Sequence, residues 1–103
     1  MARQPLRNMD KNYYIICCEN AGIFFAQIAE RRGSEADLVD ARRLHYWDGS
    51  ASVNQIAVEG LVPSSGSRVT IPVERMTVLG VVSLTPMTPT ATENILARPP
   101  WKR

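Results

Sequence analysis

The sequence predicts a single α+β domain in which an antiparallel sheet of about five strands carries two short helices. A chain of 103 residues has the length of one domain. Short runs of β-branched and aromatic residues alternate with turn residues, which is typical of antiparallel strands. Two other segments, residues 53–59 and 91–97, instead follow helix-capping residues.

The first half of the chain predicts three consecutive strands. Residues 13–18 are β-branched, aromatic and thiol-bearing, residues 19–22 indicate a turn, and residues 23–30 resume an apolar run. A second turn at residues 32–34 precedes residues 37–47, whose side chains alternate between two sets. We expect a hairpin followed by a third antiparallel strand.

A short helix is expected directly after the third strand. Asp48-Gly49 ends that strand, and Ser52 with Gln55 three positions later forms a capping-box pattern. Gly60 has the position of a helix stop. These residues predict a helix over residues 53–59.

The second half predicts two more strands and a closing helix. Residues 63–67 form a flexible loop, and Pro72 confines the strand at residues 68–71 to an edge or a terminus. Residues 76–84 are apolar on both alternating faces, which predicts a central strand, or one sandwiched between layers, at the heart of the sheet.

The C-terminal helix is expected to start at Thr88-Pro89, with proline at its first position, and to stop before Pro99-Pro100. Trp101 follows this break. Because tryptophan is costly to leave in water, we expect it to be pinned on its own domain or on a neighbouring subunit.

Residues 1–11 lack hydrophobic periodicity, and we expect a mobile N-terminal arm before a domain of residues 12–103. The arm has no apolar segment of the kind found in signal peptides or membrane anchors. Cys17 and Cys18 are adjacent, and neighbouring strand residues point to opposite faces, so reduced thiols are expected. The prediction is a cytoplasmic protein without a membrane partner.

The charge balance disfavours nucleic acid as a partner. The net charge is only +2, and ten of the twelve cations are arginine. Arginine is the better fork for phosphate and it stacks on aromatic rings, which favours a phosphorylated small ligand. Binding of nucleic acid through the basic ends is the weaker alternative, and it would use Arg3, Arg7, Lys11, Arg98, Lys102 and Arg103.

Catalysis and metal binding have little support. His45 is the only histidine, and the chain has no spacing of Cys and His that suits zinc. A nucleophilic pair of His45 with Cys17 or Cys18 is formally open, but nothing in the sequence brings them together. We therefore expect no enzyme, no cofactor and no metal site.

The candidate ligand surface lies between residues 41 and 57. Arginines on the incoming strand, aromatic side chains at its end and hydroxyl groups at the following helix start combine a cation, stacking faces and free backbone N–H groups. The residues assigned to this surface are Arg42, Arg43, His45, Tyr46, Trp47, Ser50, Ser52 and Gln55.

Each of these residues also has a purely structural interpretation. An aromatic side chain can fill the core, Ser52 and Gln55 can serve only as caps, and the arginines can face water. Alternation places Arg42 and Tyr46 on one face and Arg43 and Trp47 on the other. One pair is expected to serve the site, while the other serves packing or a subunit contact, and alternation leaves the choice open.

The chain resembles a family of small uncharacterised proteins carried by bacteriophages and prophages. The resemblance rests on Arg42-Arg43-Leu44-His45-Tyr46-Trp47, a small-residue turn, and the segment from Ser52 to Gly60. It continues through residues 21–25, the strand near residues 78–84 and the terminal residues 100–102. The longer N-terminal arm and the Pro63-Ser64-Ser65-Gly66 loop depart from the family pattern.

This resemblance implies a phage accessory protein. By analogy of size and setting, it is similar to anti-defence sponges that sequester nucleotide immune signals. The first hypothesis is a non-enzymatic homo-oligomer, in the cytoplasm of the infected bacterium, that binds a small nucleotide-like ligand. The alternative is a protein–protein interaction module, either a virion or assembly component or an inhibitor of a host protein.

Overall fold

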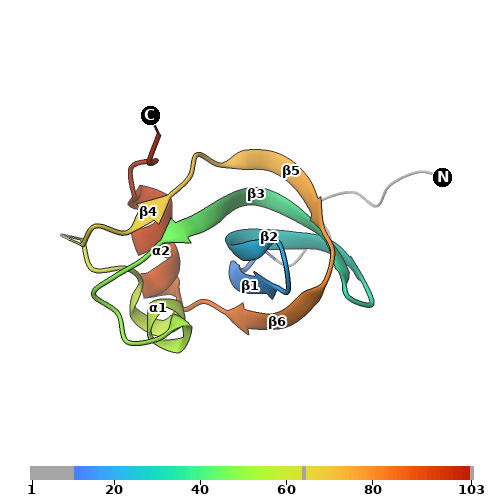
Figure 1. The fold of residues 1–103 in the computed structure, drawn as a ribbon, viewed down its shortest axis with the longest axis horizontal. Coiled ribbons are helices and arrows are strands. Elements are labelled where there is room, and N and C mark those ends of the chain that lie inside the picture. Colours follow the sequence, from blue (N-terminus) through green and yellow to red (C-terminus); the bar gives the residue numbers. More distant parts are fainter. Residues whose placement is uncertain (1–10, 64, 103) are drawn as a thin grey trace.

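The computed structural model describes residues 11–63 and 65–102 and confirms the predicted α+β fold class. One short helix follows the third strand and the other lies near the C-terminus, as expected (Figure 1). The expected N-terminal arm lies outside the described residues apart from Lys11. Within the described residues the elements are β1 (Tyr14–Cys18), β2 (Gly22–Arg32), β3 (Glu35–Tyr46), α1 (Val53–Glu59), β4 (Arg68–Val69), β5 (Val73–Val78), β6 (Val81–Pro86) and α2 (Pro89–Ala97).

The strands form one curled antiparallel sheet. Its order is β4-β3-β2-β1-β6, and β5 pairs with the first half of β3 on the same edge as β4. β5 and β6 therefore lie at opposite edges of the sheet, although only Leu79 and Gly80 join them. Figure 1 shows β5 and β6 on opposite sides of the inner strands, with the chain curving around one end of the sheet between them.

A bulge in β3 contributes to this curl. The pairing of β2 with β3 moves from Phe25↔Arg42 to Gln27↔Val39, which leaves two residues of β3 opposite one residue of β2. Asp40, in the bulge, has a φ of 54°, and an extra residue of this kind bends a strand and increases its twist. The Tyr13 hydroxyl donates to Asp40 Oδ2 at 2.5 Å and holds the bulge. Burial, followed by this hydrogen bond, raises the pKa of Tyr13.

Both faces of the sheet are covered, so the domain has two hydrophobic cores. One core fills the space between the sheet and the helices, where Phe25 and Leu44 pack against Ile56 and Ile95. The other lies inside the curl and consists of Ile16, Cys18, Phe24, Ala26, Ala36, Leu38, Ala41 and Val78. Coverage of both faces explains why β1 and the first half of β2 read as continuous apolar runs.

The expectation of one central strand over residues 76–84 is wrong. The segment divides at Leu79-Gly80 into the end of β5 and the start of β6, which are edge strands with mostly exposed or half-buried side chains. Gly80 has a φ of 73°, a left-handed conformation that ends the extended run. The central strands are β1, β2 and β3. The expected edge strand at residues 68–71 is confirmed in shorter form as β4.

The helix boundaries follow the predicted caps. Ser52 Oγ accepts from the Gln55 N–H at 3.2 Å, and Thr88 Oγ1 accepts from the Ala91 N–H at 3.1 Å. Gly60, with a φ of 83°, ends α1 and donates its N–H to the Ile56 carbonyl. The Asn94 side chain of α2 then bonds both the N–H and the carbonyl of Leu61, which fixes the two helices to each other.

The two cysteines point to opposite faces and are free thiols, as predicted. Cys17 packs against the core beneath the helices, whereas Cys18 is buried in the core inside the curl. Burial raises the pKa of the Cys18 thiol.

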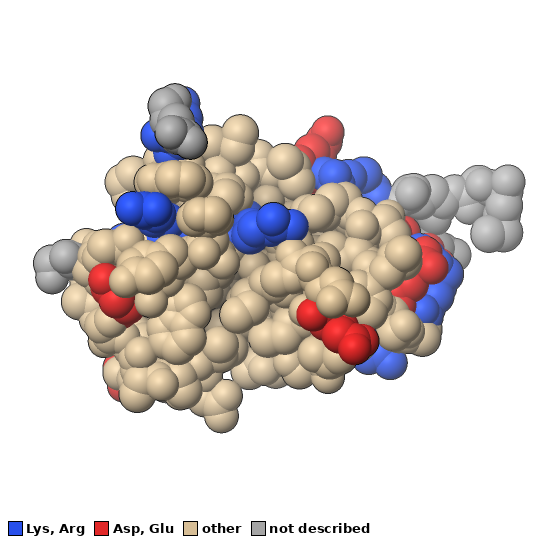
Figure 2. Space-filling model, viewed as in Figure 1, with Lys and Arg blue, Asp and Glu red and all other residues tan. Residues whose placement is uncertain are grey.

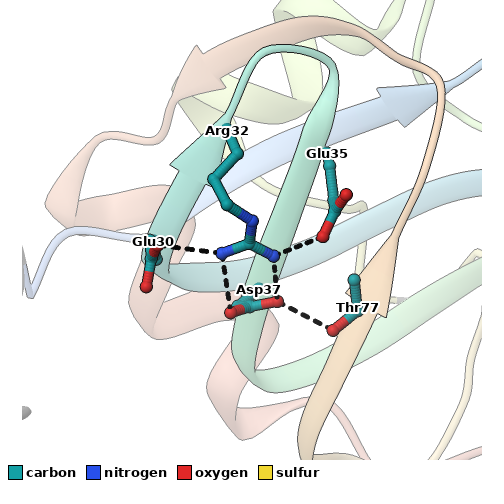
Figure 3. Close-up of polar contacts among 5 residues, drawn as sticks. All are labelled: Glu30, Arg32, Glu35, Asp37 and Thr77. Atoms are coloured by element: carbon teal, nitrogen blue, oxygen red, sulfur yellow. Dashed lines mark hydrogen bonds and ion pairs between the residues drawn. The ribbon is translucent and has the colours of Figure 1, made fainter. Parts of the chain in front are cut away.

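The tip of the β2–β3 hairpin is fixed to β5 by a charged network (Figure 3). The Arg32 guanidinium donates to both carboxylate oxygens of Asp37, at 3.1 and 3.2 Å, and it also pairs with Glu30 and Glu35. Thr77 Oγ1 of β5 donates to Asp37 Oδ1 at 2.7 Å. Arg32 is thus surrounded by carboxylates and is occupied in holding the hairpin.

Candidate ligand-binding site

Arg42 and Arg43, both assigned to ligand phosphate from the sequence, have different surroundings. Arg42 is buried beneath α2, with only 4% of its surface exposed. Its Nε donates to the Thr70 carbonyl at 2.8 Å, and its Nη1 donates to the Ile95 carbonyl at 2.6 Å. Burial lowers the pKa of Arg42; the charge of Asp40 opposes this shift, and the positive charge of Arg98 adds to it. This guanidinium joins β3 to the loop before β5 and to the end of α2.

Arg43 lies on the opposite face and is exposed. Its guanidinium carbon lies 5.1 Å from the centre of the Phe24 ring, a cation–π distance. Its backbone N–H donates to Thr70 Oγ1. No ion pair among the described residues uses Arg43.

His45 and Tyr46 meet two residues that the sequence reasoning did not assign to the site, Arg68 and Trp101. The His45 and Trp101 rings stack with centres 4.7 Å apart and planes 9° apart. The Arg68 guanidinium carbon lies 5.8 Å from the centre of the Tyr46 ring and 5.2 Å from that of Trp101. We call His45, Tyr46, Arg68 and Trp101 the aromatic–arginine ridge.

Strand pairing and the C-terminal segment position the ridge. Arg68 of β4 is the register partner of Tyr46 of β3, so their side chains are cross-strand neighbours. The Trp101 N–H donates to the Val69 carbonyl at 2.8 Å, which lays the segment after α2 beside β4. Arg98 anchors the same segment by donating to the carbonyls of Val62, Ser65 and Ser67. Trp101 is therefore pinned on its own domain, one of the two expected outcomes.

The remaining predicted residues do not join the ridge. Trp47 packs against the core beneath the helices, and the buried Ser50 Oγ has no hydrogen-bond partner among the described residues. Ser52 and Gln55 act as caps: Ser52 Oγ accepts from the Gln55 N–H, while Gln55 Oε1 accepts from the Ala51 N–H. The polar side chains at this helix start therefore satisfy its own N–H groups.

Arg68 is the charged side chain of the ridge, and no described Asp or Glu forms an ion pair with it. The ion pairs among the described residues all involve Arg32, so Arg68 has aromatic neighbours and no acidic one. In Figure 2, lysine and arginine side chains lie in separate patches with acidic side chains among them. The net charge of the whole chain is only +2, so its long-range field is weak and binding at the ridge has to rely on direct contacts.

Arg68 and Trp101 could not be assigned to the site from the sequence, because they are far from residues 41–57 along the chain. Only the fold brings them next to His45 and Tyr46. Arg68 was assigned only to an edge strand, and its pairing with Tyr46 depends on the register of β4. One indication was present in the sequence, namely Trp101 itself. A large apolar ring after two prolines is expected to pack against a protein surface.

Fold and site together define an α+β domain whose surface carries one stacked pair of aromatic rings and an arginine that has no ion pair within the described part of the chain. The chain belongs to the family of the domain of unknown function DUF6948, whose family model matches residues 11–95. The match confirms membership of an uncharacterised family. It includes His45, Tyr46 and Arg68, whereas Trp101 lies beyond it. Comparison with the curated proteins and with the solved structures found no match.

Two further findings concern the described part of the chain. It contains no group of three or more His, Cys, Asp or Glu side chains that could hold a metal ion. None of its helices has the length and hydrophobicity to cross a membrane.

Proposed function

We propose that this protein is a non-catalytic binding protein for a small phosphorylated nucleotide-like ligand, held at the aromatic–arginine ridge. The observation that carries the proposal is the place of Arg68, a cation next to two aromatic rings and without a carboxylate partner among residues 11–63 and 65–102. Arginine without an acidic partner is available for the bidentate contacts that phosphate accepts.

The rings of the ridge supply the surface for a nucleobase. Tyr46 is 49% exposed, so an aromatic face is accessible to solvent. Stacking of a base on an aromatic side chain contributes about 1–3 kcal/mol and tolerates different bases. The stacked pair of His45 and Trp101 is in place before a ligand binds, because the Trp101 backbone is hydrogen-bonded to Val69.

In this arrangement Arg68 takes the role that the sequence suggested for Arg42 and Arg43. Arg42 uses two of its nitrogens on backbone carbonyls and is buried, while Arg43 lies over Phe24. Tyr46 and Trp101 hold the Arg68 guanidinium near the base-stacking surface. A ligand with a base and a phosphate would then contact the ridge at two points.

The biological setting that we propose is a bacteriophage accessory protein acting in the cytoplasm of the infected host. There it would sequester a nucleotide signal of an immune system without converting it. Sequestration needs only tight binding, which agrees with a site made of rings and an arginine. We also propose a homo-oligomer, because β6 is an edge strand whose Val82 side chain is 66% exposed.

The binding proposal is tested by calorimetry with a panel of cyclic nucleotides and ADP-ribose derivatives. We expect at least one of them to bind the native protein, and we expect Arg68→Gln and Tyr46→Ala to weaken that binding by about tenfold or more. Arg75→Gln is the matched control, since Arg75 is an exposed arginine on β5. Absence of binding across the panel, or full binding by Arg68→Gln, would contradict the proposal.

The sequestration proposal is tested by native mass spectrometry of protein purified from cells with active nucleotide-signalling defences. A symmetric oligomer with additional mass of a few nucleotides would support both the cargo and the assembly. A bare monomer in such cells would overturn them. The Arg68→Gln protein from the same cells should lose the additional mass while keeping the oligomer.

A protein partner is the second candidate, and the composition of the ridge favours it. Tyrosine, tryptophan and arginine dominate the binding hot spots of protein interfaces, and three of the four ridge residues are of these types. This alternative predicts stoichiometric capture of one host or virion protein by the native chain but not by Tyr46→Ala, with no nucleotide bound.

A further inference from the structure

A cavity separate from the ridge lies where the β1–β2 turn meets the end of β5. Its volume is about 410 Å³, which is within the range of small-molecule sites. None of the four ridge residues lines it. The side chains that the argument uses are Glu19, Asn20, Phe24, Arg43, Met76 and Leu79.

The floor of this cavity is apolar. Phe24 and Val78 belong to the core inside the curl and are almost wholly buried, and Met76 packs against the same core. Leu79 stands at the rim with 66% of its surface exposed. A ligand with an apolar ring would cover the exposed parts of Met76 and Leu79, next to the already buried Phe24, and burial of that surface favours binding.

The polar groups of the cavity differ in charge. Arg43 has no acidic partner among the described residues, and the Phe24 ring holds its guanidinium in place. Glu19 and Asn20 come from the β1–β2 turn. A monoanion can bind to Arg43 and still offer a hydrogen-bond donor to the Glu19 carboxylate, whereas a dianion would be repelled by Glu19.

The rim of the cavity is fixed by backbone hydrogen bonds. The Glu19 N–H donates to the Gly80 carbonyl at 2.8 Å, and the Val81 N–H donates to the Ser34 carbonyl at 2.9 Å. These contacts join the β1–β2 turn, the β2–β3 turn and the link between β5 and β6. The walls are therefore largely formed before a ligand arrives.

We propose that this cavity is a binding site for a small aryl or heteroaryl carboxylate. The carboxylate pairs with Arg43, the ring covers Met76 and Leu79, and a ring N–H donates to Glu19. The site is independent of the proposed nucleotide site, because it uses Arg43 and not Arg68. Its ligand is a compact monoanion rather than a phosphate.

The test uses indole-3-acetate as the probe and isothermal titration calorimetry on the full chain. We expect indole-3-acetate to bind the native protein, Arg43→Gln to weaken binding by about tenfold or more, and Leu79→Ser to weaken it as well. Arg75→Gln and Arg68→Gln should bind like the native protein. The neutral analogue indole-3-acetamide should bind Arg43→Gln and native protein equally.

Two outcomes would overturn this proposal. One is that the native protein fails to bind indole-3-acetate. The other is that Arg43→Gln, shown to be folded by circular dichroism, binds it as tightly as the native protein. Nucleotide binding by the ridge is unaffected by either result, and its own failure would leave Arg43-dependent binding of indole-3-acetate in place.

Discussion

Two adjacent arginines on β3 illustrate how strongly surroundings decide the role of a residue type. Arg42 has 4% of its surface exposed and bonds two backbone carbonyls, while Arg43 is exposed above an aromatic ring. A buried guanidinium is stabilising only while its hydrogen bonds are kept, and its removal leaves the carbonyls without a donor.

We therefore expect Arg42→Met to lower the free energy of unfolding by about 1–3 kcal/mol. Arg43→Gln should change it by about 0.5 kcal/mol or less, as is usual for surface substitutions. Urea unfolding followed by circular dichroism measures both. Equal stabilities of the two variants would show that the Arg42 bonds to Thr70 and Ile95 contribute nothing.

Tyr13 gives a prediction about pH. Its pKa is raised above the usual value of about 10, first by burial and then by the bond to Asp40, so the folded state holds the phenolic proton more tightly than the unfolded state. This contribution is fully present below pH ~10 and is lost as the pH rises further. Tyr13→Phe should be less stable at neutral pH, and its stability should fall less between pH ~10 and pH ~11.5. Parallel pH profiles of the two proteins would contradict this.

At the scale of elements, glycines at strained positions decide where the helices and strands end. Gly33 and Gly60 both have positive φ, at 58° and 83°. A Cβ on Gly33 would meet nothing within 4 Å, whereas a Cβ on Gly60 would lie 2.5 Å from Asn94 Cγ. Gly60 also has a ψ of −171°, a conformation that essentially only glycine adopts, so its replacement adds backbone strain as well as collision.

We expect Gly33→Ala to cost about 1–2 kcal/mol, the left-handed penalty of an ordinary residue. Gly60→Ala should cost clearly more, because its backbone conformation is more strained for alanine and because the Cβ displaces Asn94 from the N–H and the carbonyl of Leu61. Thermal unfolding of both variants gives the comparison. Similar melting temperatures would contradict this expectation.

Most elements could be predicted from the sequence because their local chemistry is unambiguous. The strands around Ile15, Phe25 and Leu38, and the caps at Ser52 and Thr88, all follow from turn residues, periodicity and hydroxyl side chains. The prediction for residues 76–84 was wrong because apolar residues on both faces are also the pattern of a buried central strand. Gly80 ends that strand only because the curled sheet requires a turn there.

The ridge was only half predictable for a related reason. Periodicity identified His45 and Tyr46 on one strand, but their contacts with Arg68 and Trp101 arise from strand register and from the path of the chain after α2. Alternation separated Arg42 from Arg43 without indicating which one is exposed, since both faces of this sheet are covered.

At the scale of the whole molecule, the sheet belongs to two cores at once, and this should make unfolding cooperative. Leu38 lies in the core inside the curl and Ile95 in the core beneath the helices, and both are fully or almost fully buried. β1, β2 and β3 contribute side chains to both cores. Loss of one core therefore removes one wall of the other.

We expect Leu38→Ala and Ile95→Ala each to cost about 2–5 kcal/mol. For each variant the unfolding curves from tryptophan fluorescence and from far-ultraviolet circular dichroism should coincide. Trp47 and Trp101 both report on the side of the helices. A fluorescence transition that precedes the circular dichroism transition in Ile95→Ala would show that the two cores unfold separately.

The pairing of the last strand with the first has a consequence for synthesis on the ribosome. β1 can pair with its second partner, β6, only after some sixty further residues have been translated. The hydrogen bond from Arg42 to the Ile95 carbonyl can form only later still. The nascent β1–β2–β3 meander therefore emerges with one side of β1 open and without the helices that cover it. Such exposed edges attract chaperones or neighbouring chains, so slower translation of the residues between β3 and α2 should raise aggregation.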